Sequence, residues 1–382
     1  MEKCPAAGRC GGCQFQGVPY EDQLAKKQKE MEALLGGICP VLPIIGMKDP
    51  EGYRNKVHHA FGLDRKGRII TGSYKEDSHR IVPSDSCMLE DPVSRDIIAG
   101  IRDLAASFRF SVYDEDRGTG LLRHVLIRRG FKSGQIMVVL VTGTPVFPSR
   151  NNFVKAMVKA HPGITTVIQN VNSKRTGMVL GDRSQTLYGP GFITDELCGL
   201  RFRISAGSFY QVNPVQTEIL YRTAVEYAGL TGNETVIDAY CGTGTIGLCA
   251  AEGARRLIGV ELSAGAVRDA VSNARHNGVG NAKFFKDDAG RFMAAMAERG
   301  EKCDVLFMDP PRSGSTEEFI RSAARLAPSR IVYISCGPET LARDLRSFVK
   351  KGYKVQKAQP VDMFPFTGHT EVIAKLSRKD TD

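Results

Sequence analysis

The side chain best suited to covalent chemistry in this sequence is a cysteine in its last fifty residues. Cys336 follows the apolar segment 331–335 and precedes Gly337 and Pro338, so its thiol should lie on a tight turn at one edge of a sheet. A thiolate there could add to carbon 6 of a uracil ring and make carbon 5 nucleophilic enough to accept a methyl group. The alternative is a buried structural cysteine, which is what we expect for Cys39, Cys198, Cys249 and Cys303.

Methyl transfer to carbon 5 of uracil leaves one hydrogen too many on that carbon, so the reaction also needs a general base. Glu371 opens the last apolar segment and is the best-placed carboxylate. His369, two residues earlier, is a second candidate for the base. Either side chain could instead be an ordinary polar residue at the edge of a sheet.

A glycine-rich loop provides the candidate cofactor site. The segment Gly242–Gly247 fits the pattern GxGxxG between an apolar strand and an expected helix, and Glu261 ends the next strand. Glycines let a cofactor approach the backbone closely, and the carboxylate can accept both ribose hydroxyls. The loop alone is equally compatible with NAD and with S-adenosylmethionine.

Two later segments favour S-adenosylmethionine. Asp309 and Arg312 enclose two prolines directly after a strand, which predicts a rigid exposed turn beside the cofactor. Such a turn is common in methyltransferases that act on planar bases, whereas dehydrogenases have no use for it. Asp288 follows the third strand of the set, where the adenine end of the cofactor would lie. The alternative for Asp287 and Asp288 is a pair of surface acids.

Four further cysteines form a candidate metal site. Cys4, Cys10 and Cys13 have the spacing C-x5-C-x2-C, and Cys87 is the expected fourth thiolate. Four thiolates bind either zinc or an iron–sulfur cluster, and the spacing alone slightly favours zinc. A radical S-adenosylmethionine enzyme fits less well, because its usual spacing is C-x3-C-x2-C.

The elements that must position these residues divide the chain into three parts. Residues 1–50 contain the cysteine segment and a helix. Residues 51–205 form a basic, β-rich α+β part that we expect to be an RNA-binding domain, the alternative being that its charges are simply a solvated surface. In residues 206–382 strands and helices alternate, which predicts a doubly wound, mostly parallel α/β sheet with ligands at the carboxyl ends of its strands. Its expected strands are 235–240, 257–262, 283–286, 305–309, 331–335, 354–364 and 371–376. The last two are joined by a short link and should therefore pair antiparallel.

The helix of the first part is predicted over residues 20–35. Leu24, Met31 and Leu35 recur there at helical spacing with charged residues between them, so these three side chains should form the buried face.

The composition of the chain suits a polyanionic partner. Among 382 residues, 52 are Lys or Arg and 42 are Asp or Glu, which gives a net charge of +10. No stretch approaches the roughly 20 apolar residues of a membrane span, and the start of the chain lacks the apolar run of a signal peptide. We therefore expect a cytoplasmic protein with no membrane partner, whose ten cysteines are reduced thiols or metal ligands.

The chain resembles the RNA (uracil-5-)-methyltransferases over essentially its whole length, and in particular the iron–sulfur members that act on 23S ribosomal RNA. The motifs that carry the resemblance are Phe209–Pro214, Asp238–Gly244, Asp309–Gly314, Ser335–Pro338 and His369–Glu371. Together these motifs are highly specific for the family.

The resemblance implies a fold and a set of roles. The fold is a C-terminal Rossmann-like S-adenosylmethionine-dependent methyltransferase domain behind an N-terminal, iron–sulfur-bearing β-rich α+β domain. Cys336 would be the nucleophile and Glu371 the base. A [4Fe–4S] cluster rather than zinc would be bound by Cys4, Cys10, Cys13 and Cys87. The positions that match the family's cofactor contacts are Gln211, Tyr240, Thr245, Glu261, Asp288 and Asp309.

Two features depart from the family pattern. Gly337 stands where the family usually has asparagine, so a side-chain hydrogen bond beside the nucleophile is lost. Many relatives begin with a small β-barrel RNA-binding domain, which we expect to be absent because the cysteine segment starts at residue 4.

The implied partner is 23S ribosomal RNA, bound by a monomer, with the target uridine unpaired or flipped out of its helix. Phe209 and Tyr210 could stack on RNA bases or pack in the core. Transfer RNA is the alternative substrate, because relatives without the cluster methylate its T-loop. Outside the family, the alternatives are a nicotinamide-dependent oxidoreductase and a non-catalytic RNA-binding protein.

Overall fold

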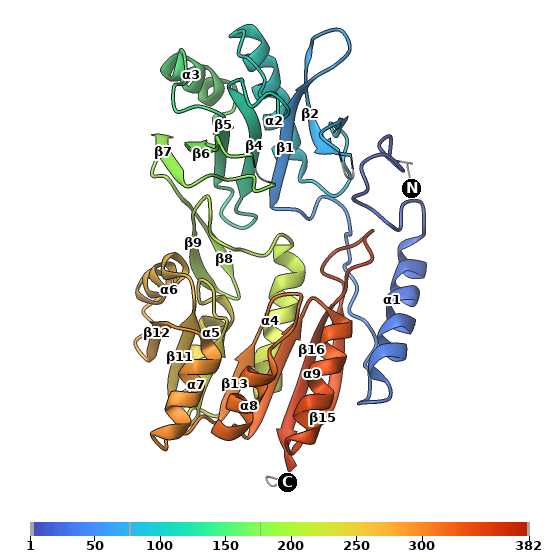
Figure 1. The fold of residues 1–382 in the computed structure, drawn as a ribbon, viewed down its shortest axis with the longest axis vertical. Coiled ribbons are helices and arrows are strands. Elements are labelled where there is room, and N and C mark those ends of the chain that lie inside the picture. Colours follow the sequence, from blue (N-terminus) through green and yellow to red (C-terminus); the bar gives the residue numbers. More distant parts are fainter. Residues whose placement is uncertain (1–3, 76–77, 176, 380–382) are drawn as a thin grey trace.

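Two large β-sheets, one above the other in Figure 1, form the body of the molecule. The computed structural model describes residues 4–75, 78–175 and 177–379. The second half of the chain forms the lower sheet, and the first half forms the upper sheet. Helix α1 (Tyr20–Leu35) lies beside the lower part, against strand β15 (Tyr353–Val361), although it comes early in the sequence. Within these ranges no helix is long and apolar enough to cross a membrane.

The lower sheet has seven strands in the order β12-β11-β10-β13-β14-β16-β15. The pairs from β12 to β14 are parallel, and β16 is antiparallel to both β14 and β15, as predicted from the short link. Its other strands are β10 (Thr235–Ala239), β11 (Arg256–Glu261), β12 (Ala282–Lys286), β13 (Val305–Met308), β14 (Arg330–Ser335) and β16 (Glu371–Arg378). The helices of this part are α4 (Pro214–Ala228), α5 (Thr245–Ala250), α6 (Ala264–His276), α7 (Ala289–Glu298), α8 (Glu317–Leu326) and α9 (Pro338–Lys350), with a short 3-10 turn at Ala251–Gly253.

Helices cover both faces of the lower sheet. In β10, Val236 packs in the cluster that includes residues of α4 and α5, and its neighbour Ile237 packs in the cluster of α7, α8 and α9. All four residues of β13 are buried, as the continuous apolar run of a central parallel strand requires. The carboxyl ends of the strands are therefore the part of the sheet that a ligand can reach.

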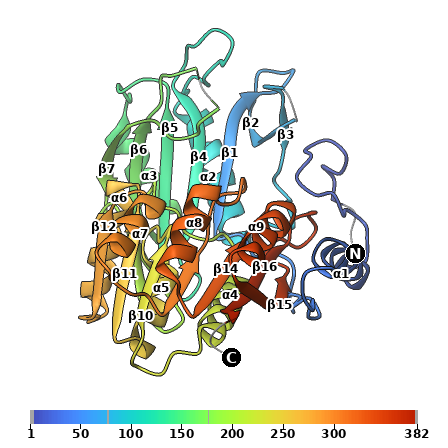
Figure 2. The same ribbon diagram turned by 60° about the horizontal axis from the view of Figure 1, so that its bottom comes forward.

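The upper sheet also has seven strands, in the order β3-β2-β1-β4-β5-β6-β7, and Figure 2 shows β7 and β3 at its two edges. Its neighbouring strands are antiparallel except for the pair β5–β6. Helices α2 (Pro92–Ser107) and α3 (Arg150–Ala160) pack against one face in a common apolar cluster. The strands are β1 (Lys56–Leu63), β2 (Ile69–Tyr74), β3 (Ile81–Pro83), β4 (Leu122–Arg129), β5 (Ile136–Thr142), β6 (Ile164–Val171) and β7 (Arg183–Tyr188).

A two-stranded hairpin joins the two parts. It consists of β8 (Ile193–Leu197) and β9 (Leu200–Ile204). Its buried residues share one apolar cluster with Met137 of the upper sheet and Leu220 of α4. This continuous core fixes the two sheets relative to each other, and with them the walls of any cleft between them.

Helix α1 has the predicted bounds but a different buried face. Met31 and Leu35 are buried as expected, whereas Leu24 is only half-buried and the other two buried positions are polar, Gln23 and Lys27. The reason is a contact with a distant part of the chain. Lys27 pairs inside the protein with a carboxylate 335 residues further along the chain, a partner that the local pattern cannot reveal.

Candidate active site

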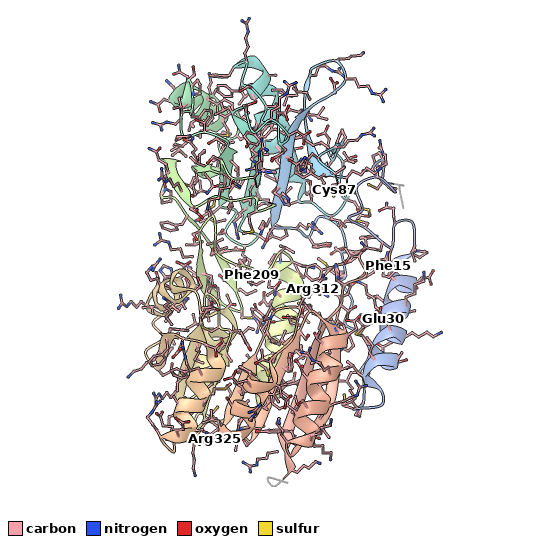
Figure 3. All side chains as sticks on the ribbon, viewed as in Figure 1. Phe15, Glu30, Cys87, Phe209, Arg312 and Arg325 are labelled. Atoms are coloured by element: carbon pink, nitrogen blue, oxygen red, sulfur yellow. The ribbon has the colours of Figure 1, made fainter. Side chains whose placement is uncertain are left out.

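A cavity of about 580 Å³ lies at the carboxyl ends of β10, β11, β13 and β14, on the side that faces the upper sheet. Figure 3 shows Phe209 and Arg312, two of its lining residues, between the two halves of the molecule. The lining contains most of the residues predicted for the site, namely Cys336, Glu371, Gln211, Tyr240, Thr245, Glu261 and Asp309. Side chains from distant parts of the sequence therefore meet where the topology predicts a ligand.

Asp288 is the predicted cofactor residue that does not line this cavity. Its carboxylate accepts a hydrogen bond of 2.9 Å from the backbone N–H of Arg291 and caps the start of α7. Asp287 pairs with the guanidinium of Arg291 on the surface. Both acids thus have structural partners, although Asp288 lies close enough to Tyr240 to raise its pKa.

The turn after β10 has the conformation that a cofactor loop needs. Gly244 has φ +82°, and a Cβ there would lie 3.1 Å from the ring of Phe284, so only glycine fits. Tyr240, at the start of the turn, has φ +64°, a strained conformation for a residue with a side chain. Glu261 accepts hydrogen bonds from the backbone N–H groups of Gly242 (3.2 Å) and Ser263 (2.7 Å), which hold its carboxylate beside the loop.

The rigid turn after β13 brings a buried acid and an exposed cation to the cavity. Burial raises the pKa of Asp309 to about 7. Arg312 donates a hydrogen bond of 2.6 Å to Nδ1 of His369. Burial and the nearby charge of Arg312 lower the pKa of His369. At neutral pH the imidazole is therefore neutral, and Arg312 engages the single nitrogen lone pair that a neutral imidazole can use as an acceptor.

Cys336 is half-buried in the cavity wall and is a protonated thiol at neutral pH. Burial raises its pKa to about 11, and the carboxylates of Glu371 and Asp309 add to the shift. Arg312 and the local backbone act in the opposite direction but do not compensate. The local backbone N–H group does favour the thiolate, but burial and the two acids outweigh it in the free protein.

Glu371 is the first residue of β16 and is buried. Burial raises its pKa to about 8, the charge of Asp309 adds to the shift, and Arg312 opposes it. A carboxyl with this pKa can hold a proton and release it near physiological pH, which is the property of a tuned acid or base.

The structure also explains the glycine that follows the nucleophile. A Cβ on Gly337 would lie 2.8 Å from Oγ1 of Thr340 and 2.9 Å from the carbonyl oxygen of Arg312. The Thr340 hydroxyl donates to that same carbonyl at 3.0 Å. The space that an asparagine would occupy is therefore filled by the turn after β13.

The two neighbouring aromatic residues have different environments. Phe209 is 70% exposed at the cavity, as a base-stacking residue would be, whereas Tyr210 is buried in the apolar core. Lys56 of β1 also lines the cavity and was not expected there. Nothing in the sequence distinguishes it from the other basic residues of the upper part, because only the docking of the two sheets brings it to the cavity.

The four predicted metal ligands surround a second, smaller cavity. Cys4, Cys10, Cys13 and Cys87 line it together with Arg54. Burial and the neighbouring thiol of Cys10 raise the pKa of Cys13 to about 11, and burial raises that of Cys87 to about 12. In the part of the chain that the structure describes, no three His, Cys, Asp or Glu side chains are placed to hold a metal ion. The thiols are thus gathered around one cavity but are not arranged as a single-ion site.

Comparisons with known proteins place the fold and the site in a family. The profile described as "tRNA (Uracil-5-)-methyltransferase" matches residues 195–379. An uncharacterized RNA methyltransferase of Halalkalibacterium halodurans is 44% identical over 99% of this chain and 83% of its own length. Another, of Caldanaerobacter subterraneus, is 43% identical over 98% of this chain and 84% of its own. The crystal structure of Pyrococcus abyssi tRNA (uracil-54, C5)-methyltransferase with S-adenosyl-L-homocysteine superposes with a TM-score of 0.80, at 28% identity, and covers 97% of this chain and 86% of that one.

The doubly wound sheet, together with its similarity to a methyltransferase structure that holds S-adenosyl-L-homocysteine, identifies the fold of an S-adenosylmethionine-dependent methyltransferase. The matching relatives narrow this class further. The chain belongs to the RNA (uracil-5-)-methyltransferase family.

Proposed function

We propose that this protein methylates carbon 5 of a uridine in 23S ribosomal RNA, with Cys336 as the nucleophile and Glu371 as the general base. The observation that supports this proposal is the meeting of the thiol, the carboxyl and the cofactor loop in one cavity. Methylation of carbon 5 of a pyrimidine needs both a thiol, which activates the ring, and a base, which removes the hydrogen from carbon 5.

Each step moves a defined electron pair. The Cys336 thiolate forms a bond to carbon 6, and the electrons of the carbon 5–carbon 6 double bond move to the oxygen on carbon 4. The electrons return as carbon 5 forms its bond to the methyl group of S-adenosylmethionine, whose sulfur would keep the electron pair of the broken sulfur–methyl bond. Glu371 then takes the hydrogen on carbon 5 as a proton, the double bond forms again, and the sulfur leaves carbon 6 with its electron pair. His369 is the weaker candidate for the base, since Arg312 occupies one of its nitrogens.

S-adenosylmethionine would be held by the loop and the strand ends around it. Glu261 is the acceptor for the ribose hydroxyls, and Asp309 lies at the end of the cavity nearest Cys336 and Glu371. The remaining proposed contacts are Gln211, Tyr240, Thr245 and Asp288.

The RNA would lie between the two sheets. The exposed ring of Phe209 can stack on a base, and the ammonium of Lys56 can approach a phosphate or a uracil oxygen from the opposite wall. We propose the same three parts as functional units: the cysteine segment and helix at 1–50, the RNA-binding part at 51–205, and the catalytic part at 206–382.

We propose that Cys4, Cys10, Cys13 and Cys87 hold a [4Fe–4S] cluster with a structural role. Four thiols around one cavity suit this donor set. Zinc, with Zn–S bonds of about 2.3 Å, would draw the thiolates to about 3.8 Å from one another. The resemblance to the iron–sulfur members, whose cluster cysteines have this spacing, favours the cluster over zinc. Iron and sulfide in anaerobically purified protein would support this assignment, and stoichiometric zinc would contradict it.

Transfer RNA is the second candidate substrate. It is supported by the similarity to the Pyrococcus abyssi enzyme, which acts on uridine 54 of tRNA. The proposed cluster favours ribosomal RNA. The cysteine spacing resembles that of the iron–sulfur members, which act on 23S ribosomal RNA, whereas relatives without the cluster methylate tRNA.

The test uses RNA that contains 5-fluorouridine. Fluorine on carbon 5 cannot be removed as a proton, so the reaction should stop at a covalent protein–RNA complex that survives denaturation. Transcripts of 23S ribosomal RNA and of tRNA are compared with the wild-type protein and with Cys336→Ala. We expect the complex with the 23S transcript and wild-type protein only. A complex with Cys336→Ala would exclude this nucleophile, and a complex with tRNA alone would move the substrate assignment to tRNA.

A further inference from the structure

The loop that leads into Glu371 is held by the N-terminal segment of the chain. Residues 362–370 connect β15 to β16 and carry His369, and in Figure 1 this loop reaches from the lower sheet towards the start of α1. Several of the contacts that hold the loop come from residues 14–27, which the catalytic steps do not use. Tyr53, Asn213 and Gln216 also donate hydrogen bonds to carbonyl groups of the loop. The N-terminal segment therefore helps to fix the position of the loop from outside the active site.

Lys27 of α1 is the centre of these contacts. Its ammonium group is completely buried and lies 2.6 Å from Oδ1 of Asp362, the first residue of the loop. It also donates to the carbonyl oxygens of Phe364 (3.2 Å) and His369 (3.0 Å). A single side chain thus binds the loop at its beginning, in its middle and two residues before Glu371.

Residues that precede Lys27 in the sequence add further hydrogen bonds to the loop. Tyr20 donates to the second carboxylate oxygen of Asp362 at 2.8 Å. The Gln23 side chain accepts the N–H of Phe366 at 2.9 Å, and Phe15 donates its own N–H to the carbonyl of Phe366 at 3.0 Å. Phe366 has φ +67°, a conformation that a residue with a side chain keeps only when its surroundings impose it.

Stability alone does not explain this arrangement. A buried ion pair recovers little more than the cost of removing its charges from water, and apolar residues of similar volume are often as stable. What Lys27 provides, and an apolar residue could not, is three donated hydrogen bonds to acceptors on one loop. From this geometry we infer that Lys27 is a positioning residue that holds Glu371 in place for proton abstraction. This inference rests on the proposed role of Glu371 as the base.

Loss of this positioning should slow one step and leave the earlier steps intact. Attack by Cys336 and methyl transfer do not need Glu371. If Glu371 is displaced, the hydrogen on carbon 5 stays in place, the double bond cannot form again, and the sulfur–carbon 6 bond persists. A displaced catalytic group costs on the order of 10- to 100-fold in rate. The methylated covalent intermediate on ordinary uridine should therefore accumulate.

The test is a double variant, Lys27→Met with Asp362→Asn, which removes both charges so that no unpaired charge stays buried. The amide oxygen introduced by Asp362→Asn would still accept from Tyr20, so the fold should be retained, and thermal melting checks this. A 23S transcript with tritium on carbon 5 of its uridines is mixed with protein and S-adenosylmethionine. We expect tritium release to fall at least tenfold and the denaturant-stable complex with this non-fluorinated RNA to increase, with an unchanged rate of complex formation on 5-fluorouridine RNA.

Two further variants separate the possible failures. Glu371→Gln should accumulate the same complex, and if it does not, the base assignment itself is wrong. Glu234→Gln weakens the ion pair of Glu234 with Arg330 at the opposite ends of the strands, far from the loop. This control variant should not accumulate the complex, and thermal melting shows how much stability it has lost. If Glu371→Gln accumulates the complex and the Lys27 double variant does not, the positioning role of Lys27 is refuted.

Discussion

The protonation of Glu371 predicts how the last chemical step depends on pH. Burial and the charge of Asp309 raise the pKa of this carboxyl to about 8. About one carboxyl in ten is then ionised at pH 7, half at pH 8 and nine in ten at pH 9. Since only the carboxylate can take the proton from carbon 5, the rate of that step should rise about fivefold from pH 7 to pH 8 and less than twofold from pH 8 to pH 9.

The first chemical step has a different dependence, which allows the two to be separated. The pKa of Cys336 is raised to about 11, so the thiolate fraction should continue to rise with pH throughout this range, less steeply near pH 8 where Glu371 ionises. In a single-turnover experiment with rapid quenching, the covalent complex forms as Cys336 attacks and decays as Glu371 removes the proton. Formation and decay are therefore measured on the same gel.

The expected result is a decay rate that levels off near pH 8 while the formation rate continues to rise. The Glu371→Gln variant is the control, because its decay phase should disappear at every pH. A decay rate that is constant between pH 6.5 and 9, or one that rises in parallel with formation, would show that Glu371 does not titrate as its burial indicates.

Three further predictions follow from single residues. Gly337→Asn, the family's usual residue, should lower stability by about 1–3 kcal/mol through overpacking and slow complex formation on 5-fluorouridine RNA. A second change, Thr340→Ala, removes one of the two close contacts. It should restore part of the lost stability, measured by thermal melting, and part of the rate of complex formation, measured on gels. Glu261→Ala should weaken S-adenosylmethionine binding in calorimetry by at least tenfold without preventing folding, and equal affinity would exclude Glu261 as the ribose acceptor. Cys87→Ala should lower the iron content of anaerobically purified protein, whereas full iron occupancy would exclude it as a ligand.

The sequence contains enough information to predict the catalytic half of this fold. The central strands are continuous apolar runs between glycine-rich turns, and each was expected within about two residues of its observed bounds, apart from the C-terminal end of β15. Cys336, Asp309 and Glu261 each follow or end one of these strands, so the parallel topology alone brings them to one edge. In this half of the chain the local hydrophobic pattern and the topology of the sheet agree, which is why its strands could be predicted from the sequence.

The residues that the sequence did not predict all depend on long-range packing. Lys27 appears as a solvent-facing charge in the pattern of its helix, because its partner Asp362 is 335 residues away. Lys56 reaches the catalytic cavity only because the core of the hairpin β8–β9 fixes the upper sheet above it. Such contacts have no local signature, since spacing along a helix or strand reports only the faces of that element.

The close approach of Cys336 and Glu371 gives the reaction an electrostatic order. Each acid disfavours a negative charge on the other, and Glu371 is the largest source of the raised pKa of Cys336 after burial. The thiolate is therefore most accessible while Glu371 is protonated. Once the sulfur is bonded to carbon 6 its charge is gone, and Glu371 can ionise before its turn to accept a proton.

This order can be measured without any RNA. Glu371→Gln removes the charge but keeps the size of the side chain, so the pKa of Cys336 should fall from about 11. The measurement is the rate of iodoacetamide labelling of the Cys336 peptide as a function of pH, followed by mass spectrometry. Cys249, which lies on helix α5, serves as the internal control, and its labelling should not change. An identical Cys336 profile in both proteins would mean that the two groups do not interact, and the coupling between nucleophile and base would then have to be abandoned.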